Sequence, residues 1–211
     1  MSFLSGGNNP FPQMPPLGRM MVFVDGENLT MRFQEMVATG RTPRNHVHHL
    51  RDTYAWSHNT VTPMLNVVHR ATYYTYVQGD ELTVDQVALQ IRDLTFANYF
   101  IVGAHHSLGW LHNKLAPCVF KKARGARAKG VDIQLTVDVL THCQHNNLDV
   151  VYLVAGDGDY RPLILEAQRI GKRVRVAALS NGLSPQLKLV ADEFIDLDNE
   201  YFVELPSSPT A

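Results

Sequence analysis

The stretch 150-VVYLVAGDGDYRP-162 decides the fold class that we predict for this chain. Val150–Ala155 is an unbroken apolar run, which is typical of a strand buried on both faces, as in a parallel sheet. The glycines of the GDGD turn let the chain change direction sharply after this strand. The same turn carries two carboxylates, Asp157 and Asp159. The stretch therefore predicts a buried parallel strand with acidic side chains at its carboxyl end.

The rest of the chain alternates between strand-like and helix-like patterns. Met20–Val24 and Val174–Leu179 are further apolar runs, and Val67–Val77 is rich in β-branched and aromatic residues. Apolar residues recur at helical spacing in four segments that we expect to be helices, namely Glu27–Thr39, Thr83–Phe96, Val131–His145 and Tyr160–Ile170. This alternation predicts an α/β fold with a mainly parallel central sheet that helices cover on both sides.

Several shorter segments carry weaker patterns. We expect a helix over His46–Trp56, a short strand at Cys118–Phe120, a helix at Ser184–Val190 and a strand at Phe194–Leu197. In the helix over Val131–His145, we expect the apolar face to consist of Ile133, Val137 and Leu140. Ala97–Pro117 has no pattern that decides between helix and strand.

Length and composition indicate one globular domain. The chain has 211 residues, of which 45% are hydrophobic and 18% charged, and these values are ordinary for a globular protein. We expect a flexible leader at 1–19, one domain at 20–198 and a tail at 199–211. The two cysteines have no metal or disulfide spacing. Without a signal peptide or a long apolar stretch, we expect a cytoplasmic protein and no membrane contact.

Acidic residues follow two of the predicted strands. Asp25 ends the first strand, while Asp157 and Asp159 follow the strand at 150–155. If these strands are neighbours, their acids share the carboxyl edge of the sheet, where α/β proteins bind ligands. Asp132 stands at the start of a helix that should face the same edge. Helix capping is the alternative explanation for each acid alone, but it does not explain several at one edge.

Clustered carboxylates repel one another unless a cation or a shared proton balances them. Oxygen ligands suit hard divalent ions, so the pattern favours a Mg²⁺-type site. Asp138 follows Asp132 by six residues, which places it about 120° further around the helix. We therefore favour Asp132 for the site and regard Asp138 as a solvated or ion-paired residue, with an accessory role as the alternative.

Basic residues are concentrated just before Asp132. No acid occurs between Asp93 and Asp132. The second half of that interval carries the cluster Lys121, Lys122, Arg124, Arg127 and Lys129. Such a cluster within a chain of net charge −1 fits a polyanion site, although a solvated loop explains the charges equally well.

Three blocks of this sequence resemble NYN domains, the LabA/DUF88-like branch of the PIN-like nuclease superfamily. The blocks are 21-MVFVDGENLTMRF-33, 129-KGVDIQLTVDVL-140 and 151-VYLVAGDGDYRPLILEAQRIGKRVRVAAL-179. The resemblance implies a Rossmann-like, three-layer α/β/α sandwich and a Mg²⁺ or Mn²⁺ site that many members use to cut RNA. The positions that match the family's site residues are Asp25, Asn28, Asp132, Asp157 and Asp159, with Asp138 as a second acid of the middle block.

The chain departs from the family pattern at two positions. Ala155 stands where the family usually has serine, so a hydroxyl is missing, and Tyr160 stands where phenylalanine is common. The first departure leaves open that catalysis is weak or lost.

We therefore hypothesise a metal-dependent endoribonuclease. Asp25, Asp132, Asp157 and Asp159 would hold one or two Mg²⁺ or Mn²⁺ ions, and the basic cluster would contact the phosphates of single-stranded RNA. A homodimer is compatible with the sequence.

Three alternatives remain. The first is an NYN module that binds RNA or a protein partner without turnover. The second is a phosphatase of the haloacid-dehalogenase type, although Asp25-Gly26-Glu27 lacks the second Asp of that motif. The third is a structural zinc site among the ten histidines, although no Cys or Glu partners them at zinc spacing.

Overall fold

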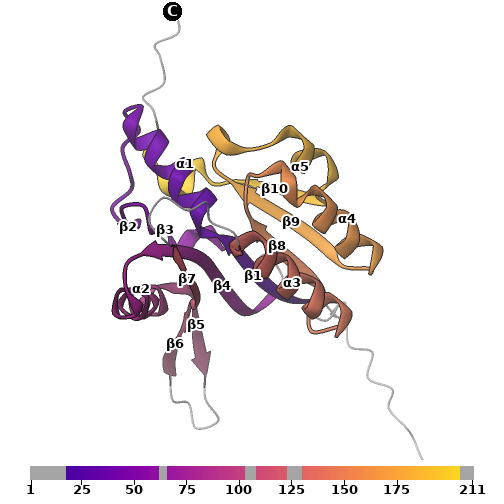
Figure 1. The fold of residues 1–211 in the computed structure, drawn as a ribbon. Coiled ribbons are helices and arrows are strands. Elements are labelled where there is room, and N and C mark those ends of the chain that lie inside the picture. Colours follow the sequence, from indigo (N-terminus) through magenta and orange to yellow (C-terminus); the bar gives the residue numbers. More distant parts are fainter. Residues whose placement is uncertain (1–17, 62–65, 103–107, 123–129, 205–211) are drawn as a thin grey trace, which may run out of the picture.

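The computed structural model describes residues 18–61, 66–102, 108–122 and 130–204. Its centre is a sheet of six strands in the order β10-β9-β8-β1-β4-β7 (Figure 1), and every neighbouring pair is parallel. The strands are β1 (Gly18–Asp25), β4 (Asn66–Gln78), β7 (Ala116–Lys122), β8 (Val150–Val154), β9 (Arg173–Ala178) and β10 (Glu193–Asp196). The predicted parallel sheet is therefore confirmed.

The helices join these strands and cover both faces of the sheet (Figure 1). They are α1 (Gly26–Ala38), α2 (Glu81–Asp93), α3 (Val131–Gln144), α4 (Arg161–Arg169), α5 (Pro185–Val190) and α6 (Asp198–Tyr201). Short 3₁₀ turns lie at η1 (His58–Thr60), η2 (Gly158–Tyr160) and η3 (Ser180–Gly182). The result is the expected three-layer α/β/α sandwich.

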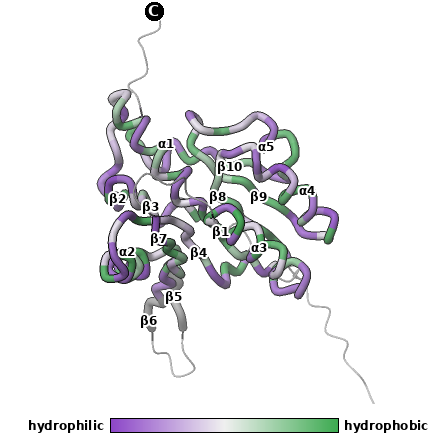
Figure 2. The backbone as a smooth tube through the Cα atoms, in the orientation of Figure 1, coloured by the Kyte–Doolittle hydropathy of each residue, from purple (hydrophilic) through white to green (hydrophobic). Residues whose placement is uncertain are grey.

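The buried strands divide their side chains between two cores. In β8, Tyr152 and Val154 face the core beneath α1 and α2, whereas Val151 and Leu153 face the core beneath α3, α4 and α5. This alternation follows from the two-residue period of a strand, and it explains why β8 reads as a continuous apolar run. Figure 2 shows hydrophobic residues concentrated along the central strands. The sheet therefore holds the two helical layers together.

The expected helix over His46–Trp56 is wrong. Two short antiparallel strands, β2 (His48–Leu50) and β3 (Tyr54–Trp56), occupy this segment. Asp52 sits between them with φ of 53°, a left-handed conformation that is incompatible with a continuing α-helix. Ala55 and Trp56 are buried in the core beneath α1, so tertiary packing outweighs the local pattern.

The predicted helix at Thr83–Phe96 is shifted. The Asp80 side chain accepts a hydrogen bond from the backbone N–H of Thr83 and so caps α2 at Glu81. Phe96 lies beyond the helix, in β5 (Thr95–Val102), which pairs with β6 (Leu108–Lys114) as a two-stranded hairpin outside the central sheet (Figure 1). The undecided segment 97–117 is thus mostly strand.

The face predicted for α3 is wrong at two of its three positions, because only Leu140 packs against the core beneath α3, α4 and α5. Ile133 and Val137 are 67% and 50% exposed, whereas Val131, Leu135 and Val139 are buried. The buried face of the helix is therefore formed mainly by Val131, Leu135 and Val139, which pack against the sheet.

The packed chain extends past residue 198. Tyr201 and Phe202 are fully buried in the core beneath α1, and Phe202 stacks on Phe33 with ring centroids 5.3 Å apart. Phe202 also forms a β-bridge with Pro43. Within the described residues, none of the helices is both long and apolar enough to cross a membrane.

Candidate active site

Asp25 ends β1 at the carboxyl edge of the sheet. Its side chain is buried, with the residue only 4% exposed, and its Oδ1 accepts a 3.0 Å hydrogen bond from the backbone N–H of Asn28 at the start of α1. Burial, reinforced by the nearby Asp132 carboxylate, raises the pKa of Asp25 to about 7. The negative charge of ionised Asp25 is therefore not compensated by a neighbouring cation among the causes that set its pKa.

The Tyr160 hydroxyl lies between two carboxylates. Its Oη is 3.1 Å from Oδ2 of Asp25 and 3.0 Å from Oδ1 of Asp132. A phenol has one proton, so Tyr160 donates to only one of these carboxylates at a time. Burial, reinforced by the two carboxylates, raises the pKa of Tyr160. One hydroxyl thus links the end of β1 to the start of α3.

The structure separates the two acids of α3. Asp132, in the first turn of the helix, is exposed and faces the carboxyl edge of the sheet. Asp138 instead accepts hydrogen bonds from the Tyr74 hydroxyl at 2.7 Å and from the Gln134 side chain at 2.8 Å. Of these two acids, the structure places Asp132 at this edge. Asp138 was expected to be solvated or ion-paired, but its two partners are the uncharged side chains of Tyr74 and Gln134.

Asn28 connects the two loops that carry acids. Its backbone N–H binds Asp25, and its side-chain Oδ1 accepts a 3.0 Å hydrogen bond from the backbone N–H of Gly156, just after β8. A Cβ atom at Gly156 would collide with the Gly182 carbonyl oxygen, so only glycine lets the loop lie this close to η3. The loop after β1 and the loop after β8 are therefore fixed to each other.

Asp157 and Asp159 point to different places. Asp157 is exposed and lines the same hollow as Asp25 and Asp132. Its Oδ1 accepts a 3.0 Å hydrogen bond from the backbone N–H of Asp159, which closes the short turn η2. Asp159 is exposed and is not among the lining residues of this hollow.

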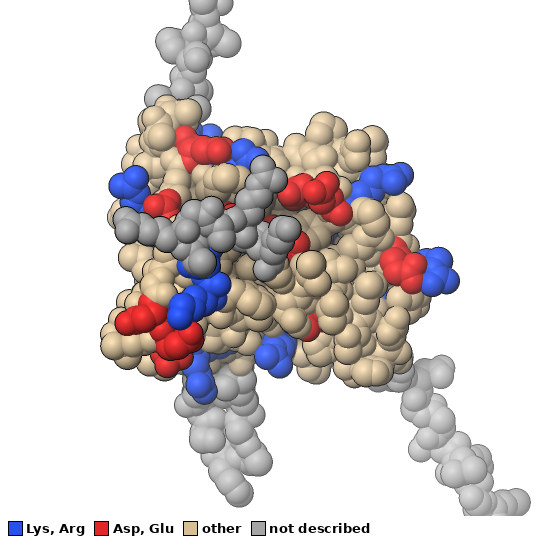
Figure 3. Space-filling view, in the orientation of Figure 1, with Lys and Arg blue, Asp and Glu red and all other residues tan. Residues whose placement is uncertain are grey.

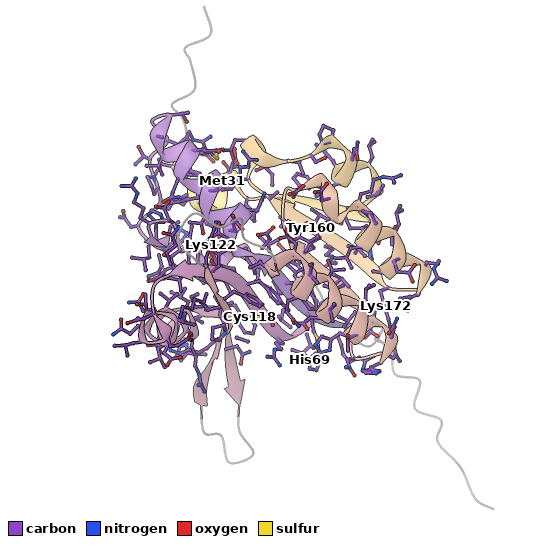
Figure 4. The ribbon with its side chains drawn as sticks, in the orientation of Figure 1. Met31, His69, Cys118, Lys122, Tyr160 and Lys172 are labelled. Carbon is purple, nitrogen blue, oxygen red and sulfur yellow. The ribbon has the colours of Figure 1, made fainter. Side chains whose placement is uncertain are left out.

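The hollow at this edge has a volume of about 340 Å³. Its lining among the described residues is Asp25, Glu27, Asn28, Met31, Lys122, Asp132 and Asp157. Four of these side chains are carboxylates and one is a cation, so the hollow is strongly acidic. In Figure 4, Met31, Lys122 and Tyr160 mark this region, between α1 and the start of α4.

The predicted basic cluster is only partly described. Lys121 and Lys122 belong to β7 and not to a loop, so their side chains point in opposite directions. Lys122 lines the hollow, with its Nζ 3.9 Å from the centre of the Tyr76 ring, whereas Lys121 forms a 2.9 Å ion pair with Glu81. Arg124, Arg127 and Lys129 lie outside the described residues. Figure 3 shows cations and carboxylates interspersed on the visible face, without a continuous basic band among the described side chains.

Sequence reasoning missed Tyr160 and Glu27 as members of the site. The role of the Tyr160 hydroxyl depends on a contact with Asp25 across 135 positions, which no local pattern reports. Glu27 could have been found from the sequence, because it is an acid two residues after Asp25 in the DGEN turn. Its carboxylate accepts a hydrogen bond from the Tyr76 hydroxyl.

The donor set fits a Mg²⁺-type ion. In the parts of the chain that the structure describes, no three His, Cys, Asp or Glu side chains are grouped closely enough to form a metal cage. Mg²⁺ does not require one, because it commonly binds one or two carboxylates and keeps several waters. Asp25 and Asp132 supply two carboxylates around one hydroxyl, and Asp157 adds a third at the rim of the hollow.

The fold agrees with comparisons to known proteins. The crystal structure of a protein of unknown function, VPA0982 from Vibrio parahaemolyticus RIMD 2210633, has the same fold, with a TM-score of 0.58 at 20% identity over 91% of this chain and 100% of that chain. The uncharacterized protein MJ0482 of Methanocaldococcus jannaschii is 32% identical over 74 residues, or 35% of this chain and 31% of that protein. The chain thus matches about a third of that relative's length.

A family model gives the broadest match. The model of the NYN domain covers residues 19–198, which include both loops and the helix start that form the acidic hollow. The chain therefore belongs to the NYN domain family, a nuclease-like family of the PIN-like superfamily.

Proposed function

We propose that this protein is a metal-dependent ribonuclease that hydrolyses phosphodiester bonds of single-stranded RNA at the acidic hollow. The observation that carries the proposal is the pair Asp25 and Asp132 around the Tyr160 hydroxyl, with Asp157 lining the same hollow. A buried carboxylate with a raised pKa beside further acids calls for a cation. Family membership adds weight, since NYN nucleases generally use divalent metals.

Each acid has its own part in this proposal. Asp25 and Asp132 would hold Mg²⁺ or Mn²⁺ directly, and Asp157 would hold it directly or through water. A bound divalent ion would supply an activated water and neutralise charge on the phosphodiester. Asp159 lies outside the hollow, so we assign it the positioning of Asp157 through the hydrogen bond from its backbone N–H.

Other side chains prepare the site for substrate. The Tyr160 hydroxyl lies within hydrogen-bond distance of both Asp25 and Asp132 and so keeps the two carboxylates apart at a fixed spacing. Asn28 fixes the loop that carries Asp157 against α1. Lys122 is the described cation in the hollow, and it would contact a phosphate of the RNA backbone. Hydrolysis would break one P–O bond, with water providing the hydroxyl on phosphorus and the proton on the leaving oxygen.

The test is cleavage of an end-labelled, mixed-sequence RNA in Mn²⁺, in Mg²⁺ and in EDTA. Asp25→Asn and Asp157→Asn should reduce cleavage at least tenfold, while Asp85→Asn, an exposed acid of α2, serves as the matched control. Cutting in EDTA, or full activity in both site variants, would refute the proposal. Release of phosphate from p-nitrophenyl phosphate would point to a phosphatase instead.

A second candidate is an NYN module that binds RNA without cutting it. Ala155, where the family usually has serine, favours this candidate, and its side chain is buried in the core beneath α3. Filter binding of the same RNA in EDTA separates the two. Binding without cleavage in either metal would select the module.

A further inference from the structure

A second pocket adjoins the acidic hollow. It has a volume of about 500 Å³ and lies between α1, the β2–β3 turn and the carboxyl end of β4. Its lining is Glu27, Thr30, Met31, Gln34, Asp52, Thr53, Thr75, Tyr76, Val77, Gln78 and Lys122. Glu27, Met31 and Lys122 line both spaces, so a ligand in the pocket lies next to whatever the hollow holds.

Side-chain hydrogen bonds fix the walls of this pocket. The Thr75 hydroxyl donates to the Thr53 carbonyl at 2.8 Å, which ties the β2–β3 turn to β4. The Tyr76 hydroxyl donates to Glu27, and Lys122 lies over the Tyr76 ring. These contacts hold the pocket open between two elements.

Asp52 offers a carboxylate at the outer end of the pocket. The Gln34 side chain donates to its Oδ1 at 3.1 Å and accepts from its backbone N–H at 3.0 Å. The Asp52 side chain is nevertheless 74% exposed, and its 3.5 Å ion pair is with Arg51, whose side chain is 88% exposed. Gln34 therefore orients Asp52 while leaving it accessible to a ligand.

The lining disfavours a phosphate group. Among the described lining residues, two carboxylates, Glu27 and Asp52, stand against one cation, Lys122, so an anion would be repelled. Met31, which is 42% exposed, offers a polarizable apolar surface of the kind that packs on flat rings. A neutral, flat group that carries N–H donors suits this combination.

We propose that this pocket takes the nucleobase next to the cleaved phosphodiester and favours guanine over uracil. The assignment rests on the ribonuclease function proposed above. Guanine presents two neighbouring donors, N1–H and the 2-amino group, which match the two oxygens of a carboxylate such as Asp52. Uracil presents one N–H between two carbonyl oxygens, which a carboxylate repels. The pocket would thus select guanine over uracil by the number of N–H donors that the base presents to the carboxylate.

Binding of mononucleotides to the full chain in EDTA tests the pocket without cleavage. The probes are GMP, IMP, which lacks the 2-amino group, and UMP, and the readout is the shift of the Met31 methyl NMR signal, assigned with Met31→Leu. GMP should bind at least about tenfold more tightly than IMP, the loss expected for one hydrogen bond to a charged group. UMP should bind more weakly than IMP.

Asp52→Asn is the decisive variant. Asparagine tolerates the left-handed backbone found at this position, so the turn should keep its shape while one acceptor oxygen is lost. The ratio of GMP to IMP affinity should fall to about one in this variant and stay unchanged in Asp85→Asn. Equal binding of GMP and UMP by the natural protein, or an unchanged ratio in Asp52→Asn, would overturn the assignment.

Cleavage of RNA then separates the two proposals. If mononucleotides bind with the expected order and no RNA is cut, the ribonuclease proposal fails, and the pocket stands only as a guanine-binding site of a module that does not cut RNA. If RNA is cut with no preference for guanine beside the cut, and Asp52→Asn cuts at the same positions, the pocket assignment fails and the ribonuclease proposal stands.

Discussion

Replacing Asp25 with asparagine should stabilise the metal-free protein at neutral and alkaline pH, although Asp25 is central to the proposed reaction. The native pKa of Asp25 is raised to about 7 because the carboxyl group is buried, whereas an unfolded aspartate titrates near 3.9. Between these two values the native state holds a proton that the unfolded state has lost. Stability therefore falls as the pH rises through this window.

The size of the effect follows from this difference. Where only the native state is protonated, the free energy of unfolding falls by about 1.4 kcal/mol for each unit by which the pH rises. Between pH 5 and pH 7, the natural protein should lose about 2 kcal/mol of stability relative to a variant that carries no charge at this position, because the native carboxyl group is already half ionised at pH 7. Asparagine also suits the site, because its amide can donate to the Tyr160 oxygen while Tyr160 donates to Asp132.

Urea unfolding followed by circular dichroism at pH 5, 6, 7 and 8 in EDTA would measure the effect. The relevant quantity is the free energy of unfolding of Asp25→Asn minus that of the natural protein, because the other titrating groups are shared and cancel. This difference should grow steadily from pH 5 to pH 7 and then level off. A difference independent of pH, or a variant less stable at pH 8, would refute the reasoning.

Four further outcomes are expected. Tyr160→Phe removes a hydrogen bond that lowers the pKa of Asp25, so the midpoint of metal-dependent cleavage should move to higher pH; a downward shift would contradict this. Mn²⁺ should raise the melting temperature more at pH 8 than at pH 5.5, because a metal binds ionised carboxylates, and scanning fluorimetry would show it. Asn28→Ala leaves the Gly156 N–H without its acceptor and should cost about 1–3 kcal/mol in urea unfolding. Glu193→Ala leaves the buried Arg175 without its 2.7 Å ion pair and should cost about 3 kcal/mol in the same assay.

The central sheet was predictable because burial on both faces forces unbroken apolar runs. Val150–Ala155 shows this most clearly, since its side chains must fill two cores at once. The meeting of Asp25 with the loop of Asp157 followed from the same logic once β1 and β8 proved to be neighbours. The order of the strands was therefore enough to predict that these two loops meet.

Details that depend on partners distant in the chain were not predictable. Apolar residues lie on more than one side of α3, and only the position of the sheet decides that Leu135 is buried and Ile133 is exposed. The different directions of Lys121 and Lys122 follow from β7 extending to Lys122, two residues beyond the expected strand. The β2–β3 turn was hidden because its stability comes from the burial of Trp56 and not from local propensity.

The burial of Tyr201 and Phe202 has a consequence for synthesis. These rings pack on Phe33 of α1, so one of the two cores joins residues from near the start of the domain to residues from near its end. β1 likewise lies between β4 and β8 and pairs with both, and it gains its second neighbour only after residue 154 has emerged. Contacts of such long sequence separation form slowly. We therefore expect the nascent chain to expose apolar strands until the whole domain has been translated, a state in which proteins of this size are prone to aggregate.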